Sequence, residues 1–348
     1  MLSRPSKSVL LQVFIGAISL SYGFPDWINY RENFVHNPDG WRLYLRGGVE
    51  APWQYRIGIW MVVDWMHRLF RWKPYDTLTL IDVVCLAGAL WCMLFVLRHS
   101  RFYGAASSRT RWLAVASALF LAEYYLAWGH WYQTGVTMPS ILFVAASLAL
   151  ISGGLVKSRP LACLLLIALG WVQGFIRADV AVFLHAGIFL TVVFNRNVNV
   201  PLGRLWQAGS SAVIALLAGC IQLYLMFVRF PNAKYGPGGV IRLAANAHPG
   251  MWLTMLLALL PYWLLLGLVL TRRYRPSGPA TMLLTGSVLY LAVWATVGLL
   301  DEVRIFLPFA FALIPATTLA FICLIPKPDY DGKPAEAEVH REAGTAPA

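Results

Sequence analysis

The chain has 348 residues, of which 59% are hydrophobic and only 13% charged, and its formal net charge is +12. This composition excludes an ordinary soluble globular protein. The length leaves room for about ten membrane spans of roughly 20 residues and one sizeable loop. The Lys and Arg residues are spread over short loops rather than massed on one domain. We therefore expect membrane lipids, and not nucleic acid, as the partners of this positive charge.

Lys and Arg gather in four short loops between long apolar runs, at 98–111, 157–159, 195–207 and 271–275. These loops hold eleven Lys and Arg residues and no Asp or Glu, whereas eleven of the sixteen acids lie in the alternating segments or just inside the neighbouring runs. This is the positive-inside pattern of a protein that crosses a membrane many times. It predicts the cytoplasmic (inner) membrane as the location and places the chemistry on the opposite, outer face.

The fold class that this pattern predicts is an all-α polytopic membrane protein with about ten transmembrane helices and both termini in the cytoplasm. The first span is expected to be retained, because no clear small-x-small cleavage site follows it. Residues 1–325 would form one membrane domain, and 326–348, which are polar and rich in Pro and Ala, a disordered cytoplasmic tail. The predicted crossings are 8–24, 76–97, 112–129, 137–156, 160–176, 180–194, 208–228, 250–270, 280–300 and 304–325.

The first outer loop is predicted at 25–75, and its segment 55–72 is the hardest to place. Charged residues interrupt this segment, and its tryptophans are typical of interface anchors. An odd number of crossings must separate the outer loop from the basic loop at 98–111, and 76–97 supplies one. We therefore predict that 55–72 is a helix on the outer membrane surface, and leave open that it dips into the membrane.

The first outer loop is also strongly aromatic. Aromatic faces stack on sugar rings, but they also anchor loops at the layer of lipid headgroups, and the sequence does not separate these two roles. The aromatic residues are Trp27, Tyr30, Trp41, Tyr44, Trp53 and Tyr55.

Three acids are candidates for chemistry. Asp26 follows the first predicted span, where a carboxylate can deprotonate or orient an incoming hydroxyl group, although a helix cap or a solvated loop acid has the same pattern. Asp82 and Glu123 lie inside the outer halves of predicted spans, roughly 9 Å deep at about 1.5 Å per residue. An ionisable group at that depth is costly, so both are expected to face a water-filled cavity or to form a structural pair with a buried partner.

Basic residues offer candidate phosphate ligands. Arg177 lies at the tip of a tight predicted outer hairpin and could bind a lipid phosphate or reach to the interface. Asp179 is two residues away, and the two would not face each other on a helix. Lys234 and Arg242 flank the glycine run 236–239, which could close on a phosphate or serve as an ordinary connector. No His or Cys spacing predicts a metal site, so no protein-ligated metal is expected.

Three features together resemble the GT-C superfamily of membrane glycosyltransferases. Asp26-x-x-x-Tyr30 resembles the Asp-x-x-x-Tyr of bacterial members, and the surface helix 55–72 fits their first outer loop. The segment Asp301–Pro308 looks like a Glu-x-Arg-Phe-x-x-Pro segment, with Ile305 in place of Phe. The run from Gly170 to Asp179 also looks like a recurring Gly…Arg hairpin. Two departures are that Trp27 replaces the acid that follows the catalytic Asp in protein mannosyltransferases, and that no soluble outer domain follows the last predicted span.

The resemblance implies transfer of a sugar from a polyprenyl-phosphate donor to a glycan or lipid acceptor. Asp26 would be the catalytic residue, and Glu302 would hold Arg304 in place. A divalent cation stays open as a cofactor, because a phosphate that leaves on a lipid does not require one. Further residues implied in substrate binding are Tyr30, Asp82, Glu123, Arg177, Lys234, Arg242, Glu302 and Arg304.

Two other classes of function remain open. A transporter, flippase or polymerase component for lipid-linked glycans would use the intramembrane acids for coupling or passage, and a broken helix in mid-membrane would favour it. A non-catalytic membrane subunit would instead position a partner enzyme.

Overall fold

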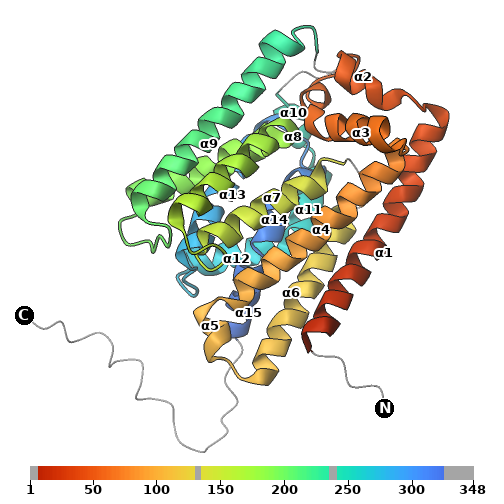
Figure 1. Cartoon of the computed structure of the whole chain (residues 1–348). Helices are drawn as coiled ribbons and strands as arrows, with labels where there is room; N and C mark the ends of the chain where they lie inside the picture. The colour runs from red at the N-terminus through yellow and green to blue at the C-terminus, as the bar shows by residue number, and fades with distance from the viewer. Residues whose placement is uncertain (1–6, 130–134, 235–240, 325–348) are drawn as a thin grey trace, which may run out of the picture.

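The computed structural model describes residues 7–129, 135–234 and 241–324, and every regular element within these ranges is a helix (Figure 1). The predicted all-α class is therefore confirmed.

The elements are α1 (Lys7–His36), α2 (Gly40–Arg46), η1 (Trp53–Tyr55), α3 (Ile57–Phe70), α4 (Pro74–Arg98), α5 (Arg101–Ala105), α6 (Ser108–Gly129), α7 (Thr137–Ile151), α8 (Arg159–Phe194), α9 (Arg204–Tyr224), the π-helix η3 (Leu225–Arg229), α10 (Leu243–Asn246), α11 (Pro249–Ala258), α12 (Leu260–Leu270), α13 (Gly278–Val297), η4 (Val303–Ile305), α14 (Leu307–Ala312) and α15 (Ile314–Leu324). The predicted tail and glycine run lie outside the described residues.

The predicted crossings fall on single helices, on the two halves of α8, or on two or three consecutive helices. By length and apolar composition, five described helices could cross a membrane, namely α1, α4, α8, α9 with η3, and α13; a sixth would be the pair α11–α12, which is bent by 79°. The apolar helices α7 and α15 are shorter, with 15 and 11 residues. The fold is thus that of a helical protein suited to a membrane, while the count of ten crossings stays a prediction.

Helix α1 is longer than predicted, because it continues through Pro25 to His36. The residues after 24, predicted as loop, are therefore helical for about three turns. Packing against α4 explains why Pro25 does not end the helix: Gly23 lies against Val83 before it, and Tyr30 contacts α4 after it. Asp26 consequently projects from a packed helix and not from a loop.

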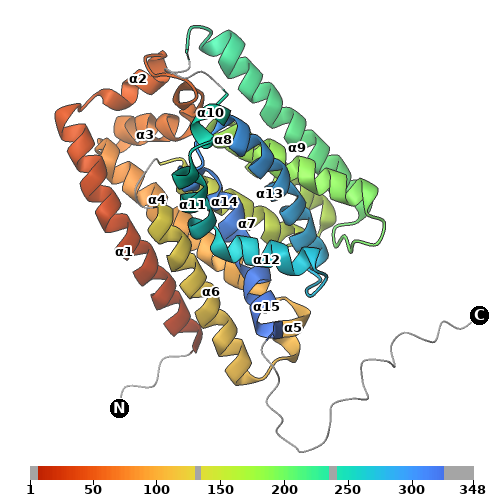
Figure 2. The same cartoon turned by 180° about the vertical axis from the view of Figure 1, so that it is seen from behind.

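Helix α8 reverses its direction at Arg177, whose backbone leaves the helical region (φ −152°, ψ 83°). The half before the break meets α9 in parallel order, and the half after it in antiparallel order. The contacts are Cys163 with Trp206 and Gly174 with Ile221 before the break, then His185 with Ser211 and Val192 with Arg204 after it. The predicted hairpin with Arg177 at its tip is present, and its two halves pack on α9 and α13 (Figure 2).

Glycines allow these helices to approach closely. A side chain at Gly170 or Gly174 would collide with α9, and one at Gly187 would collide with the backbone of Gly286 on α13. In a membrane the hydrophobic effect does not drive helices together, because the lipid chains are as apolar as the side chains. Close packing of this kind is therefore a main source of helix association there. They fix the position of the Arg177 turn.

The short elements α2, η1 and α3 lie across one end of the bundle (Figure 1). We call it the outer end, after the side on which the predicted topology puts it. Helix α3 is the helix predicted at 55–72. Gly58 packs against Ile176 beside the α8 turn, and Ile59 and Val63 are buried, while Trp65, Leu69 and Phe70 are exposed. A helix with one packed face and one exposed apolar face is suited to lie along a membrane surface.

Candidate active site

Two acids and a tyrosine from α1 and α4 meet inside the outer end. The Tyr30 hydroxyl donates a hydrogen bond to Asp82 Oδ2 over 2.7 Å. Asp26 lies one helical turn before Tyr30, on the same face, and its carboxyl group is close enough to that of Asp82 for a hydrogen bond. Both acids are 1% exposed, and among the described residues neither Oδ1 atom has a hydrogen-bond partner. We call these three residues the carboxyl cluster.

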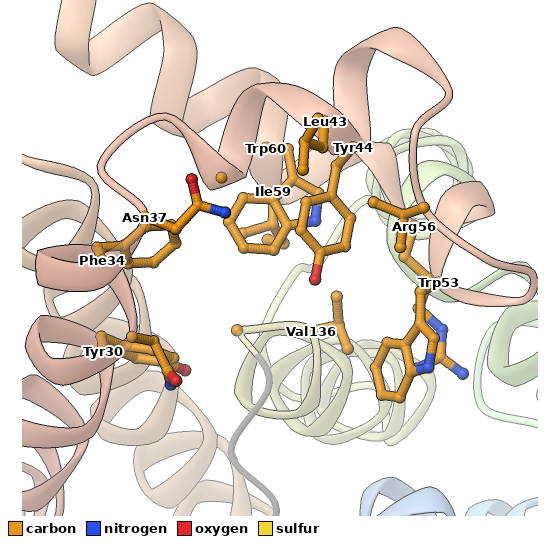
Figure 3. Close-up of a pocket in the computed structure, with 14 residues that line it drawn as sticks. Tyr30, Phe34, Asn37, Leu43, Tyr44, Trp53, Arg56, Ile59, Trp60 and Val136 are labelled. Carbon is orange, nitrogen blue, oxygen red and sulfur yellow. The ribbon is translucent and has the colours of Figure 1, made fainter.

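A cavity of about 400 Å³ adjoins the carboxyl cluster, and Tyr30 forms part of its wall. Figure 3 shows Tyr30 and Phe34 on one side, Trp53 and Arg56 on the other, and the Tyr44 hydroxyl between them. The Tyr44 and Trp60 rings stack with their centroids 4.1 Å apart. We call this the aromatic cavity; its lining is Tyr30, Asn33, Phe34, Asn37, Gly40, Leu43, Tyr44, Val49, Trp53, Arg56, Ile59, Trp60, Gly135 and Val136.

The aromatic cavity combines ring faces with the amide groups of Asn33 and Asn37, and Arg56 is its one charged lining residue within the described chain. Ring faces and convergent amide groups are the surfaces that bind a neutral polyhydroxyl ligand. The structure brings the aromatic loop residues Tyr30, Tyr44 and Trp53 together at one cavity, as the sugar-binding alternative of the two roles requires.

A second cavity, of about 600 Å³, lies on the other side of Arg56, and we call it the cationic cavity. Its charged lining residues are Arg56, Arg177, Asp179 and Arg242. Apolar side chains of α9, η3 and α13 complete it, among them Leu223 and Val297, which are 54% and 41% exposed on the bundle surface. The cavity therefore offers a charged inner wall and an apolar opening between α9 and α13.

Arg177, Asp179 and Tyr290 form a closed ionic cluster in the wall of the cationic cavity. Arg177 Nη2 lies 2.6 Å from Asp179 Oδ2 and also donates to the Tyr290 hydroxyl, which donates to the same carboxylate oxygen over 2.7 Å. Arg177 Nη1 donates to the carbonyl oxygen of Ile305 over 3.2 Å. The expectation that Arg177 and Asp179 would not face each other was wrong, because it assumed helical backbone at Arg177, which is extended.

Trp53 and two arginines form the partition between the cavities. The guanidinium carbon of Arg56 lies 4.6 Å from the Trp53 ring centroid, and that of Arg304 lies 5.0 Å from it. Arg304 is buried and lies 3.3 Å from Glu302, so the predicted contact between these two residues is present. Burial and the neighbouring Arg177 and Arg304 lower the pKa of Arg56 to about 10, so Arg56 remains charged at neutral pH.

Other predicted site residues lie elsewhere or act differently. Glu123 is exposed on α6 and lines neither cavity, because the neighbouring Ala122 and Tyr125 take the buried face of that helix. Asp82 belongs to the carboxyl cluster and lines neither cavity, so of its two predicted settings the structure shows the pairing with a buried partner, Tyr30. The Lys234 side chain is exposed, and its carbonyl oxygen accepts a hydrogen bond from the backbone N–H of Ala51. Arg242 lines the cationic cavity, as its predicted phosphate-binding role requires.

Sequence reasoning missed two residues that the structure brings into the site. Arg56 was treated as one of several charges that interrupt a surface helix, although it is the residue that lines both cavities. Tyr290 lies within an apolar run with no pattern to distinguish it. The proximity of Trp53 to Arg56, three residues apart on the η1 turn, is the signal that could have singled out Arg56 as a cation held by an aromatic ring.

Among the described residues, no group of three or more His, Cys, Asp and Glu side chains is arranged to hold a metal ion. Comparison with protein families, with curated proteins and with solved structures finds no match to this chain.

Proposed function

We propose that the protein is a membrane glycosyltransferase that transfers a sugar from a polyprenyl-phosphate donor to a glycan or lipid acceptor on the outer face. One observation carries this proposal: an aromatic, polyol-suited cavity and a cationic cavity with an apolar opening share the residue Arg56. A lipid-linked sugar has these three parts in this order, namely a polar ring, an anionic phosphate and an apolar chain.

The donor would bind with its lipid chain at the opening between α9 and α13. Its phosphate would lie against the arginines of the cationic cavity, where the developing negative charge of the leaving group is stabilised. Its sugar would lie towards the aromatic cavity. The volume of about 600 Å³ suits the phosphate and the first isoprene units, and the remaining chain would stay in the surrounding lipid.

The carboxyl cluster would supply the proton acceptor. As the acceptor hydroxyl oxygen bonds to the anomeric carbon, the bond from that carbon to the phosphate oxygen breaks and polyprenyl phosphate leaves. The acceptor's proton passes to the Tyr30 oxygen while the Tyr30 proton passes to Asp82, over the hydrogen bond of 2.7 Å. Asp26, beside Asp82, would share the proton that arrives. In this form Asp82 is the base, and Asp26 acts on the acceptor only through Asp82 and Tyr30.

The membrane arrangement belongs to the same proposal. We infer about ten crossings with both termini in the cytoplasm, and α3 on the outer membrane surface. The reversal of α8 supports two crossings for that element, and the acids and cavities of the outer end lie on the side opposite the basic loops.

Mass spectrometry of envelope glycans and lipid-linked sugars tests the proposed function. A deletion strain would be complemented with wild type, with Asp26→Asn, or with Glu32→Gln, at equal membrane levels. Glu32 is the control because it is an exposed acid on the same helix. We expect wild type and Glu32→Gln to restore a missing sugar and Asp26→Asn to fail. Full restoration by Asp26→Asn would remove Asp26 from the mechanism, and no change in any glycan would remove the proposed function.

Transport of a lipid-linked glycan is the second candidate, and the 79° bend between α11 and α12 favours it. A broken helix of this kind is typical of transporters. Flux of a labelled lipid-linked sugar across vesicles, lost in Asp82→Asn, would select transport. Sugar transfer by wild-type protein in detergent, where no flux exists, would select the transferase.

A further inference from the structure

Three arginines approach the partition between the cavities, but they differ in how their guanidinium groups are satisfied. Arg177 is occupied by Asp179, Tyr290 and the carbonyl oxygen of Ile305. Arg304 is paired with Glu302. In the described part of the chain, the Arg56 guanidinium makes no salt bridge and no hydrogen bond; it stacks on the face of Trp53, and the charge of Asp179 acts on it without a direct contact. A half-buried guanidinium without a salt bridge or hydrogen bond has N–H donors left for a ligand.

The position of Arg56 specifies what that ligand would be. It is the charged residue that lines both cavities, so a group bound there reaches the aromatic and the cationic cavity at once. The charged lining of the cationic cavity is Arg56, Arg177 and Arg242 against Asp179, or three positive charges and one negative, net +2. A sugar phosphodiester carries one negative charge, and the phosphomonoester that leaves approaches two at neutral pH. The cavity's charge therefore matches the leaving group better than the bound donor.

We propose that Arg56 is the residue that binds the phosphate of the lipid ligand, while Arg177 and Arg304, already paired, shape the wall around it. This inference rests on the proposed function for its ligand, and it revises the expectation that Arg177 or Arg304 performs this role. A guanidinium fork can bind two phosphate oxygens together, and the Trp53 ring holds the fork in place. Burial beside two other arginines makes the charge of Arg56 costly, as the lowered pKa of this residue indicates, and a bound anion offsets that cost.

The test is a binding measurement on the detergent-purified full chain. The probes are farnesyl phosphate as a short lipid phosphate, inorganic phosphate, and farnesol, which has the chain without the phosphate. The variants are Arg56→Gln, Arg56→Lys and the control Arg46→Gln. Arg46 is an exposed arginine of α2 at the same end of the molecule. Tryptophan fluorescence reads the binding, since Trp53 contacts Arg56.

We expect Arg56→Gln to weaken farnesyl phosphate binding by about 10-fold to 100-fold, the effect of losing a charge-assisted contact. Arg56→Lys keeps the charge but not the fork, so its loss should be smaller, and Arg46→Gln should change binding by less than about threefold. Farnesol should bind all variants equally. Because the Arg56 guanidinium makes no salt bridge or hydrogen bond within the described chain, the melting temperature of ligand-free Arg56→Gln should stay near that of wild type, whereas a structural role would lower it. If Arg56→Gln does not fold, the Arg56→Lys comparison decides.

The remaining outcomes separate this inference from the proposed function. Unchanged farnesyl phosphate affinity in Arg56→Gln overturns the role of Arg56, even if wild type transfers sugar. Loss of affinity in Arg56→Gln without any sugar transfer by wild type supports the phosphate site and overturns the transferase. Equal affinity for inorganic and farnesyl phosphate overturns a lipid as the ligand.

Discussion

The outer end of the molecule contains two polar clusters that look alike and differ in charge. Tyr30 with Asp82 and Asp26, and Tyr290 with Asp179 and Arg177, each place a tyrosine hydroxyl 2.7 Å from an aspartate. The second cluster is complete, because an arginine balances the acid and its donors are used. The first has two acids and no described cation, and it leaves carboxylate oxygens unpartnered.

This difference indicates different roles. A cluster whose charges and donors are already paired with each other has little left to offer a ligand, so its value is to hold the α8 turn against α13. Unbalanced groups are costly to keep buried, and proteins tolerate them chiefly where chemistry uses them. The carboxyl cluster has two acids and no described cation beside them, whereas Arg56 is a cation without a salt bridge in the described chain. The aromatic cavity lies between the two. A reaction that moves a proton to the carboxyl cluster and negative charge towards Arg56 would use both groups.

The largest expected effect is on turnover in Asp82→Asn. An amide still accepts the Tyr30 hydrogen bond, so the fold should hold, with a change in the free energy of unfolding within about 1 kcal/mol. It cannot accept a proton, so sugar transfer should fall by about 100-fold to 10,000-fold at saturating donor. Transfer rates and donor affinity, measured on the same purified sample, check this. A parallel loss of stability and activity would make the carboxyl cluster structural and remove the contrast.

Asp179→Asn should instead act mainly on stability, by lowering the free energy of unfolding. It leaves the Arg177 charge uncompensated at a side-chain exposure of 2%. Loss of one partner of a buried ion pair costs about 3 to 5 kcal/mol, and we expect about 3 kcal/mol because the Asp179 side chain is 40% exposed in the cavity and water can reach it. Unfolding in mixed detergent micelles measures this. Adding Arg177→Met should recover part of the loss, and a single variant as stable as wild type would contradict the closed cluster.

The sequence predicts many of the elements of this site, but not the contacts between residues that are far apart in the chain. The helices and the α8 hairpin follow from the apolar runs, but the shared face of Asp26 and Tyr30 does not, because the sequence predicted a loop after residue 24 where α1 continues to His36. The contact of Asp26 with Asp82 joins two helices, so no local pattern predicts it. Glu123 was misplaced because α6 is apolar on most of its surface, and periodicity then does not tell which side faces the core.

The pairing of Arg177 with Asp179 depended on a single residue with extended backbone, which spacing rules for helices do not anticipate. Arg56 was missed for a related reason: charges in an interfacial segment look alike in sequence, and only the fold distinguishes a solvated one from one that faces a cavity. In both cases the backbone around one arginine decided its role.

The smallest expected effect is the pH dependence of farnesyl phosphate binding, which is also the most specific test of Arg56. The pKa of Arg56 is lowered from its ordinary value of 12.5 to about 10, so the residue is charged up to pH 9 and loses its proton above pH 10. Only the charged form binds the anion, so affinity should rise between pH 5 and 7, as the phosphomonoester takes its second charge, and stay level to pH 9. Affinity should fall above pH 10, as Arg56 loses its proton. In Arg56→Gln the rise at low pH should remain in weaker form and the alkaline fall should vanish. An alkaline fall of the same size in Arg56→Gln would assign the phosphate to another cation, and the contrast between paired and unpaired arginines would lose its functional meaning.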